Sequence, residues 1–154
     1  MNIGWREWVA LPDLGIPAIK AKIDTGARSS AIHAFNLDTF DKRGRPWVAF
    51  DLHPIQRHAH PSVRCTAPLR GYRDVRSSNG DVEERPLIRT RLALGPYRRW
   101  KIDLTLTNRD EMGFRLLLGR RALRRRCVID PGRSFLQGVP PTGPATPARH
   151  EDPI

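Results

Sequence analysis

The most informative part of the sequence is Ile23-Asp24-Thr25-Gly26-Ala27-Arg28-Ser29-Ser30. It follows the segment 18–23, where apolar residues alternate with lysines, a pattern that predicts a strand with one buried face. The strand therefore delivers a carboxylate, a hydroxyl and a glycine to one turn. An isolated Asp-Thr-Gly is more often a plain turn, so the rest of the chain has to supply further evidence.

A second informative element lies downstream and reads Phe114-Arg115-Leu116-Leu117-Leu118-Gly119-Arg120-Arg121-Ala122-Leu123. It predicts an apolar strand that ends in glycine and leads into a short helix, which we expect over residues 120–126. Together the two elements resemble the active site of aspartic peptidases, and especially of the single-domain retropepsins. In that class the second element packs beside the Asp-Thr-Gly loop, so the resemblance implies that Leu118, Gly119 and Arg120 support it.

The remaining sequence predicts many short strands separated by turns. Asn79-Gly80 is a strong hairpin signal and is the candidate for the flap of a retropepsin. Further strands are expected at 5–11, 31–35, 47–52, 87–94 and 100–107. We therefore expect an all-β fold, a closed and mostly antiparallel β-barrel of the retropepsin type with one short helix.

Four separated blocks of sequence carry a closer resemblance, namely residues 4–9, 20–31, 104–109 and 130–136. They resemble a bacterial retropepsin-like family labelled either as ATP-dependent zinc proteases or as RimK-associated, RimB-like peptidases. The likeness covers about residues 3–138. It implies an aspartic endopeptidase whose substrate is the glutamate tail that the ligase RimK adds to a small-subunit ribosomal protein.

Aspartic peptidase chemistry needs two neighbouring carboxylates that share one proton, and this chain has one Asp-Thr-Gly. The resemblance implies a homodimer in which each subunit contributes Asp24 as the catalytic residue. Thr25 would link the two loops through its hydroxyl, and Gly26 would allow close approach to the carboxylate. Ala27, Arg28 and Ser29 would line or support the site, with Ser29 as a hydrogen-bond donor to Asp24.

Residues 129–134 echo the first motif as Ile-Asp-Pro-Gly-Arg-Ser, so Asp130 is an alternative partner for Asp24 within one chain. Pro131 lacks the hydroxyl of Thr25 and has no N–H to donate. The segment also lies after the Gly119 helix, where a retropepsin has the strand that builds the dimer interface, and Asp-Pro-Gly is more often a turn than a catalytic motif.

The chain is strongly basic, with a formal net charge of +11 that arises mainly from 23 arginines. Arginine matches carboxylates and phosphates bidentately, so an acidic peptide is the favoured partner and nucleic acid is a further one. The same composition also results when a GC-rich genome encodes Arg in place of Lys. The arginines at 120–126 are either a solvated face or a binding patch, and Arg28 either binds substrate or forms a structural salt bridge.

Length and composition predict one domain over residues 1–138 and a disordered tail over 139–154, where five of sixteen residues are proline. The chain lacks a run of apolar residues long enough for a membrane span, and it has no recognisable signal sequence. Its two cysteines form no CxxC pair. These features favour a cytoplasmic protein that does not associate with membranes.

The zinc and ATP of the family label find little support in the residues. His53, His58, His60 and Cys65 lie close in sequence, but prolines interrupt them and HExxH and Walker motifs are absent. We expect no metal and no cofactor. The alternatives to an aspartic peptidase are a zinc-dependent peptidase and a non-catalytic barrel that binds ribosomes or RNA.

Overall fold

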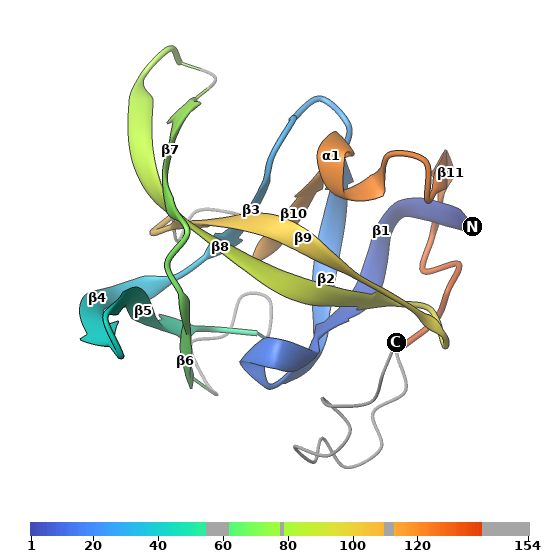
Figure 1. Cartoon of the computed structure of the whole chain (residues 1–154). Coiled ribbons are helices and arrows are strands. Elements are labelled where there is room, and N and C mark those ends of the chain that lie inside the picture. The colour runs from blue at the N-terminus through green and yellow to red at the C-terminus, as the bar shows by residue number, and fades with distance from the viewer. Residues whose placement is uncertain (55–61, 78, 110–112, 140–154) are drawn as a thin grey trace.

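Strands make up most of the molecule, as the alternating sequence predicts. The computed structural model describes residues 1–54, 62–77, 79–109 and 113–139. Along the chain the elements are β1 (Asn2–Leu11), η1 (Pro12–Leu14), β2 (Ile16–Asp24), β3 (Ser30–His33), β4 (Phe35–Lys42), β5 (Arg45–Leu52), β6 (Val63–Pro68), β7 (Gly71–Arg76), β8 (Val82–Leu94), β9 (Arg98–Thr107), β10 (Leu116–Gly119), α1 (Arg120–Leu123) and β11 (Val128–Ser134) (Figure 1).

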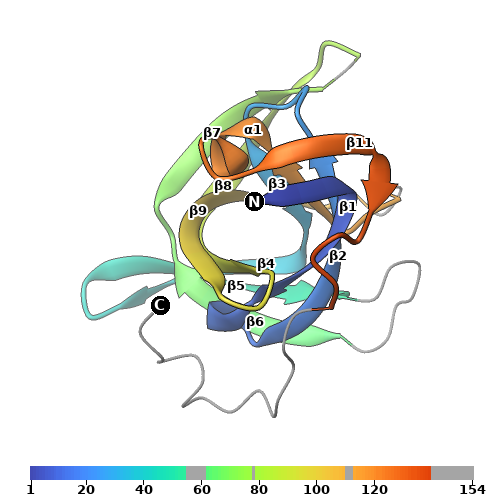
Figure 2. The ribbon, with the colours of Figure 1, turned by 90° about the vertical axis from the view of Figure 1, so that its right-hand side faces the viewer.

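Six strands close into a β-barrel, which confirms the predicted fold class. The larger sheet has the order β11-β1-β2-β10-β3-β9-β8-β7, and a further pairing of β1 with β8 joins Ala10 to Ala93 and closes the ring. Figure 2 looks into this ring of strands. Most pairings are antiparallel, but β1–β11, β2–β10 and β3–β9 are parallel. A smaller sheet contains β4, β5 and β6 in that order.

The barrel core comes from the inward-facing residues of each alternating strand. On β9, for example, Ile102, Leu104 and Leu106 are all buried. The largest completely buried side chains are Phe50, Ile3, Leu11, Ile16, Ile19, Ile32, Leu52, Ile88, Leu92, Leu94, Leu104 and Leu106. Among the described residues, the structure contains no helix with the length and apolar character needed to cross a membrane.

The predicted end of the helix was wrong. The helix ends at Leu123, three residues before the predicted end, because Arg124 turns extended and Arg125 adopts a positive φ of 64°. Residues 130–132 lie within the strand β11, as the resemblance to retropepsins implies, and not in the turn that Asp-Pro-Gly favours. Pro131 is tolerated there because β11 is an edge strand that pairs on one side only.

The predicted tail lies almost entirely outside the described residues, so its disorder remains a prediction. The predicted strand at 31–35 is divided, because β3 ends at His33 and β4 begins at Phe35 in the other sheet. A positive φ of 53° at Asn36 accompanies this change of sheet. The chain therefore re-enters the barrel as β3 after the Asp24 loop and leaves it again for the smaller sheet at β4.

Candidate active site

The loop after β2 is interlocked with the end of β10. The strands β2 and β3 are not neighbours, because β10 lies between them, parallel to β2 and antiparallel to β3. The loop that joins β2 to β3 must therefore pass over the end of β10. This topology sets Ile23 beside Leu118 and Asp24 beside Gly119 in the parallel register. The two sequence elements that we singled out thus meet in space.

Backbone hydrogen bonds hold the loop against the start of α1. The amide of Arg120 donates to the carbonyl oxygen of Ala27 at 2.9 Å, and the amide of Arg121 donates to that of Arg28 at 3.2 Å. The fit at Gly119 is tight, because a Cβ atom built there would lie 2.4 Å from the carbonyl oxygen of Ser29. Only glycine leaves the loop in this position, which explains the apolar-apolar-Gly pattern.

The side chain of Arg120 fixes the turn itself. Its Nη1 atom donates to the carbonyl oxygens of Thr25 and Gly26, at 3.2 Å in both cases. Asp24 is half-buried, and a Cβ atom on Gly26 would lie 3.4 Å from its Oδ1 atom. The carboxylate therefore lies close against the glycine backbone. Thr25 and Gly26 are exposed in the single subunit, so this end of the loop faces outward.

Ser29 is the serine expected to donate a hydrogen bond to Asp24, but Ser30 forms the hydrogen bonds that hold the loop against β10 and β9. The buried hydroxyl of Ser30 accepts a hydrogen bond of 3.0 Å from the amide of Gly119, and its carbonyl accepts one of 3.1 Å from the Thr105 hydroxyl. In the described part of the chain, Ser29 forms no hydrogen bond with Asp24. The strand β3 begins at Ser30 and all four of its residues are buried, so no alternation in the sequence distinguishes Ser30 from Ser29.

A groove of about 860 Å³ runs between the loop and the hairpin of β7 and β8. Gly26, Ala27, Arg28 and Ser29 line one side, and residues 73–76 of β7 line the other. Arg28 is exposed in the groove and forms no ion pair with any described residue, so it is not the structural salt bridge of the alternative interpretation. Asp24 is not one of the lining residues.

The candidate flap is the tip of the β7–β8 hairpin. Its turn contains hydrogen bonds from the Ser77 amide to the Asp81 carbonyl, at 2.7 Å, and from the Gly80 amide to the Ser77 carbonyl, at 2.9 Å. Gly80 has a positive φ of 93°, which is why the turn needs glycine. Figure 1 shows the hairpin projecting beyond the barrel. Asn79 and Gly80 are exposed at the tip, whereas residues 73–76 of β7 and Arg85 of β8 border the groove.

The single chain does not place Asp130 beside Asp24. The strand β1 lies between β2 and β11, so two strand spacings, roughly 9–10 Å of sheet, separate the two residues. The Oδ1 atom of Asp130 instead accepts a hydrogen bond of 3.0 Å from the amide of Gly132. This local contact explains the Asp-Pro-Gly sequence without a catalytic role.

The histidine-rich segment gives no metal centre in the part of the chain that is described. Residues 1–54, 62–77, 79–109 and 113–139 contain no group of three His, Cys, Asp or Glu side chains placed to hold a metal ion. His33 and His53 lie with their ring centres 6.0 Å apart. The Nδ1 atom of His33 accepts a hydrogen bond of 3.1 Å from the amide of Arg109. His58 and His60 lie outside the described residues.

Comparison with known proteins agrees with this geometry. A solved protein of unknown function from Legionella pneumophila, Lpg0085, matches with a TM-score of 0.74 and 28% identity, over 88% of this chain and 97% of that one. Two curated relatives are each named probable alpha-L-glutamate ligase. The relative from Shewanella halifaxensis is 48% identical over 136 residues, which is 88% of this chain and 30% of that protein. The relative from Desulfotalea psychrophila is 50% identical over 129 residues, which is 84% of this chain and 28% of that protein.

The chain thus spans less than a third of the length of these two relatives. The family match, in contrast, extends over nearly all the described residues. The model of the RimB-like family, described as retropepsin-like aspartic endopeptidase RimB, matches residues 2–140. This chain therefore belongs to the RimB-like family of retropepsin-like proteins.

Proposed function

We propose that this protein is a homodimeric aspartic endopeptidase in which Asp24 of each subunit forms the catalytic pair. The observation that carries the proposal is the geometry of the Asp24 loop. Asp24 pairs in register with Gly119, and the Arg120 side chain donates hydrogen bonds to the carbonyl oxygens of Thr25 and Gly26. This rigid support presents Thr25 and Gly26 at the surface of the single subunit. A two-fold axis beside these exposed residues would bring two such loops together.

The proposed chemistry follows from the pairing of like charges. Two carboxylates in contact cannot both ionise easily, so they share one proton and titrate as a unit. The ionised carboxylate accepts a proton from water, and the resulting nucleophile attacks the scissile carbonyl carbon. The protonated carboxyl donates its proton to the carbonyl oxygen. Such general acid–base assistance contributes about 10²–10⁴-fold to the rate.

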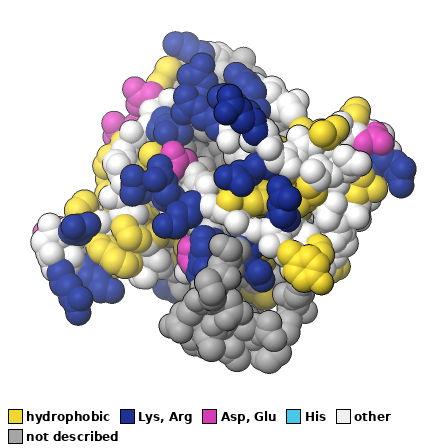
Figure 3. All heavy atoms as spheres, turned by 45° about the vertical axis from the view of Figure 1, so that its right-hand side comes forward, with side chains coloured by type: hydrophobic (Ala, Val, Ile, Leu, Met, Phe, Trp, Pro, Cys, Tyr) yellow, Lys and Arg dark blue, Asp and Glu magenta, His cyan; other side chains and the backbone are white. Residues whose placement is uncertain are grey.

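The charge of the groove supports an acidic substrate. The described residues that line the groove include one acidic residue, Asp74, against the basic residues Arg28, Arg73, Arg76, Arg85, Arg120 and Arg121. Figure 3 shows Lys and Arg side chains crowding one face of the molecule, with few acidic side chains among them. Because its relatives are named glutamate ligases, we infer that the substrate is a glutamate tail, such as one added to a ribosomal protein.

The experiment compares cleavage of a peptide with an oligoglutamate tail by the wild type and by Asp24→Asn. We expect cleavage by the wild type and a loss of about 10²–10⁴-fold in the variant. Asp130→Asn is the matched control, because Asp130 belongs to the echo motif and lies two strands away. Sedimentation with and without peptide reports whether dimers form. Full activity of Asp24→Asn would disprove the proposal.

The basic surface also supports a second candidate function, a barrel that binds RNA without catalysis. Binding to RNA through phosphates weakens steeply with salt and does not depend on Asp24. The same proteins therefore separate the two functions. Salt-sensitive RNA binding that persists in Asp24→Asn, together with no peptidase activity in the wild type, would favour the binding module.

A further inference from the structure

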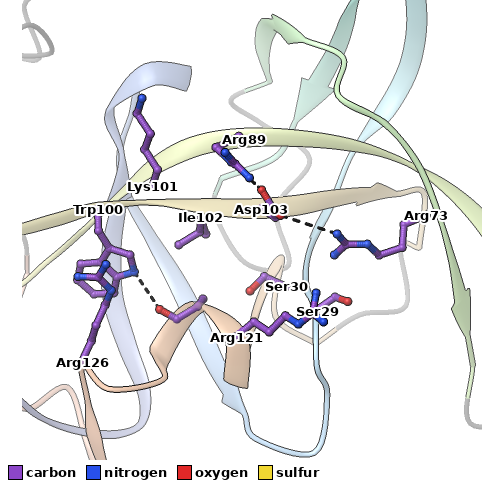
Figure 4. Close-up of a pocket in the computed structure, with 11 residues that line it drawn as sticks. Ser29, Ser30, Arg73, Arg89, Trp100, Lys101, Ile102, Asp103, Arg121 and Arg126 are labelled. Carbon is purple, nitrogen blue, oxygen red and sulfur yellow. Dashed lines mark hydrogen bonds and ion pairs between the residues drawn. The ribbon is translucent and has the colours of Figure 1, made fainter.

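A second cavity, of about 280 Å³, lies where the Asp24 loop ends and β3 begins (Figure 4). Ser29 and Ser30 of the loop region form part of its wall. Among the described residues that line it, Asp103 on β9 is the only acidic one. Five basic residues line it as well, from β7, β8, β9 and the region of α1, namely Arg73, Arg89, Lys101, Arg121 and Arg126. The cavity therefore carries an excess of positive charge that the described residues do not neutralise.

Asp103 neutralises only part of this charge. Its Oδ1 atom accepts from Nε of Arg89 at 2.9 Å, and its Oδ2 atom lies 3.8 Å from Nη2 of Arg73. The guanidinium of Arg121 forms no ion pair within the described ranges. In Figure 4, Arg121 and the two serines lie across the cavity from Asp103 and Arg73. Arg73 is thus weakly held and Arg121 is available to an incoming anion.

The far wall of the cavity is rigid. The indole Nε1 of Trp100 donates a hydrogen bond of 2.9 Å to the carbonyl oxygen of Ala122, and the Trp100 side chain is buried. The guanidinium of Arg126 covers the indole ring at 5.0 Å from its centre. A fixed wall keeps the cavity open without a ligand and limits the entropy lost on binding. The covered ring is not available for stacking with a nucleobase.

The cavity opens beside the substrate groove. Ser29, Arg73 and Arg121 line both spaces, so these three residues mark the boundary between them. The strand β7, which borders the groove, is the free edge of the larger sheet. An extended peptide can pair with such an edge through its main chain, and alternate side chains then point to one side. A side chain of a peptide in the groove can therefore reach the cavity.

We propose that this cavity is a specificity subsite that binds the carboxylate side chain of a substrate residue, with Arg73 and Arg121 as its ligands. The inference rests on the proposed peptidase function. It attributes the preference of the peptidase for acidic peptides to Arg73 and Arg121. Arginine forks bind carboxylates with paired hydrogen bonds, and a rigid, partly enclosed site strengthens them. A peptide is favoured over nucleic acid because β7 offers backbone pairing and Trp100 offers no stacking surface.

The test measures kcat/KM for a series of peptide pairs. The two peptides of a pair differ only in having Glu or Gln at one position, and each position of the peptide is tested in turn. For Arg121→Met and Arg73→Met we expect a loss of about 10- to 100-fold on the Glu peptide, and little change on the Gln peptide. Arg45→Met is the control, because it removes the same charge from an exposed position of β5. An unchanged ratio between Glu and Gln peptides in both subsite variants would overturn the proposal.

A third variant removes a negative charge instead of a positive one. It should raise the preference for Glu, so its result cannot be explained by a loss of activity through altered folding. Asp103→Asn removes a carboxylate that competes with the ligand for Arg73, so we expect the preference for Glu over Gln to rise several-fold. A fall in that preference would contradict the subsite. Melting temperatures of all variants, measured alongside, identify any that fail to fold.

Binding in the Asp24→Asn background separates this proposal from the peptidase proposal. If the wild type cleaves no peptide but Arg121→Met still weakens binding of a fluorescent oligoglutamate peptide, the subsite stands and the peptidase proposal fails. Binding of an oligouridylate that Arg121→Met weakens, without any preference for Glu over Gln peptides, would overturn the subsite in favour of nucleic acid.

Discussion

The amide of Gly119 donates a hydrogen bond of 3.0 Å to the hydroxyl of Ser30, a residue 89 positions earlier in the chain. This bond joins β10 to β3 at the point where the Asp24 loop re-enters the barrel. It is buried, so neither group has water as an alternative partner. The loop conformation therefore depends on contacts between segments that are far apart in sequence.

Replacement of Gly119 by alanine is expected to destabilise the fold by about 3 kcal/mol or more. The new Cβ would lie 2.4 Å from the Ser29 carbonyl oxygen, and this backbone atom cannot move without disrupting the loop. Urea unfolding measures the change. Gly132→Ala is the control, because the nearest atom to its new Cβ is 3.5 Å away. Equal stability of the two variants would contradict the interlocked geometry.

Glu7 is expected to hold the C-terminal segment onto β1. Its side chain is fully buried and accepts hydrogen bonds from the amides of Gly4 at 2.7 Å, Leu136 at 2.8 Å and Gln137 at 3.1 Å. Glu7→Ala leaves these amides without that acceptor, so we expect a loss of about 3 kcal/mol or more. Hydrogen exchange at Leu136 and Gln137 should accelerate most.

The control for Glu7 is Glu84→Ala, which removes an exposed carboxylate of β8. We expect its stability to stay within about 0.5 kcal/mol of the wild type. If exchange at Leu136 and Gln137 is the same in both variants, the carboxylate does not hold the segment.

Glu83 is expected to make stability depend on pH in the acid range. Partial burial raises the pKa of its carboxyl, but hydrogen bonds from Thr107 at 2.8 Å and Arg85 at 2.6 Å outweigh this and leave the pKa below its ordinary value of 4.5. The unfolded chain therefore binds this proton more tightly than the folded one. The stabilisation is fully present well above pH 4.5 and is lost as the pH falls through the folded pKa.

Glu83→Gln should consequently reduce stability near neutral pH and converge with the wild type at low pH. Urea unfolding at several pH values between neutral and about pH 3 measures this convergence. Glu84→Gln serves as the control, because Glu84 neighbours Glu83 on the same strand. A constant difference between Glu83→Gln and the wild type across the range would refute the assignment.

The two cysteines are expected to differ in reactivity. Burial raises the pKa of the Cys65 thiol to about 12, and its Sγ atom donates to the Leu14 carbonyl oxygen at 3.4 Å. Burial also raises the pKa of Cys127, although that residue is only half-buried. The thiolate is the reactive form, so a maleimide near pH 8 should label Cys127 slowly and Cys65 only after unfolding. Mass spectrometry locates the label. In the Cys127→Ser variant Cys65 is the remaining thiol, so rapid labelling of this folded variant would contradict the burial of Cys65.

Local sequence patterns predicted the strands well, because alternation of apolar residues reports directly which face of a strand is buried. Residues 18–23 and 100–107 show this in β2 and β9. The helix after Gly119 was overestimated, since a run of arginines does not reveal where the chain turns back. Asp130-Pro131-Gly132 favours a turn as a local sequence, and only the resemblance pointed to the edge strand that is found there.

The motifs also identified the two halves of the candidate site, but not their fine arrangement. Asp24 and Gly119 meet in register as the family resemblance implies. The role of Ser30 was not predicted, because both serines follow the motif closely and only the tertiary structure shows that Ser30 accepts the Gly119 hydrogen bond. The roles of these residues in catalysis remain predictions.

The sequence by itself determined the type of each strand and the two motifs, since both are properties of neighbouring residues. The tertiary structure decided that β10 inserts between β2 and β3, and that Arg73 and Arg121 border one cavity. These relationships join segments that are far apart in the chain. Local periodicity contains no information about which strands become neighbours, because that choice depends on burial and backbone pairing across the whole barrel.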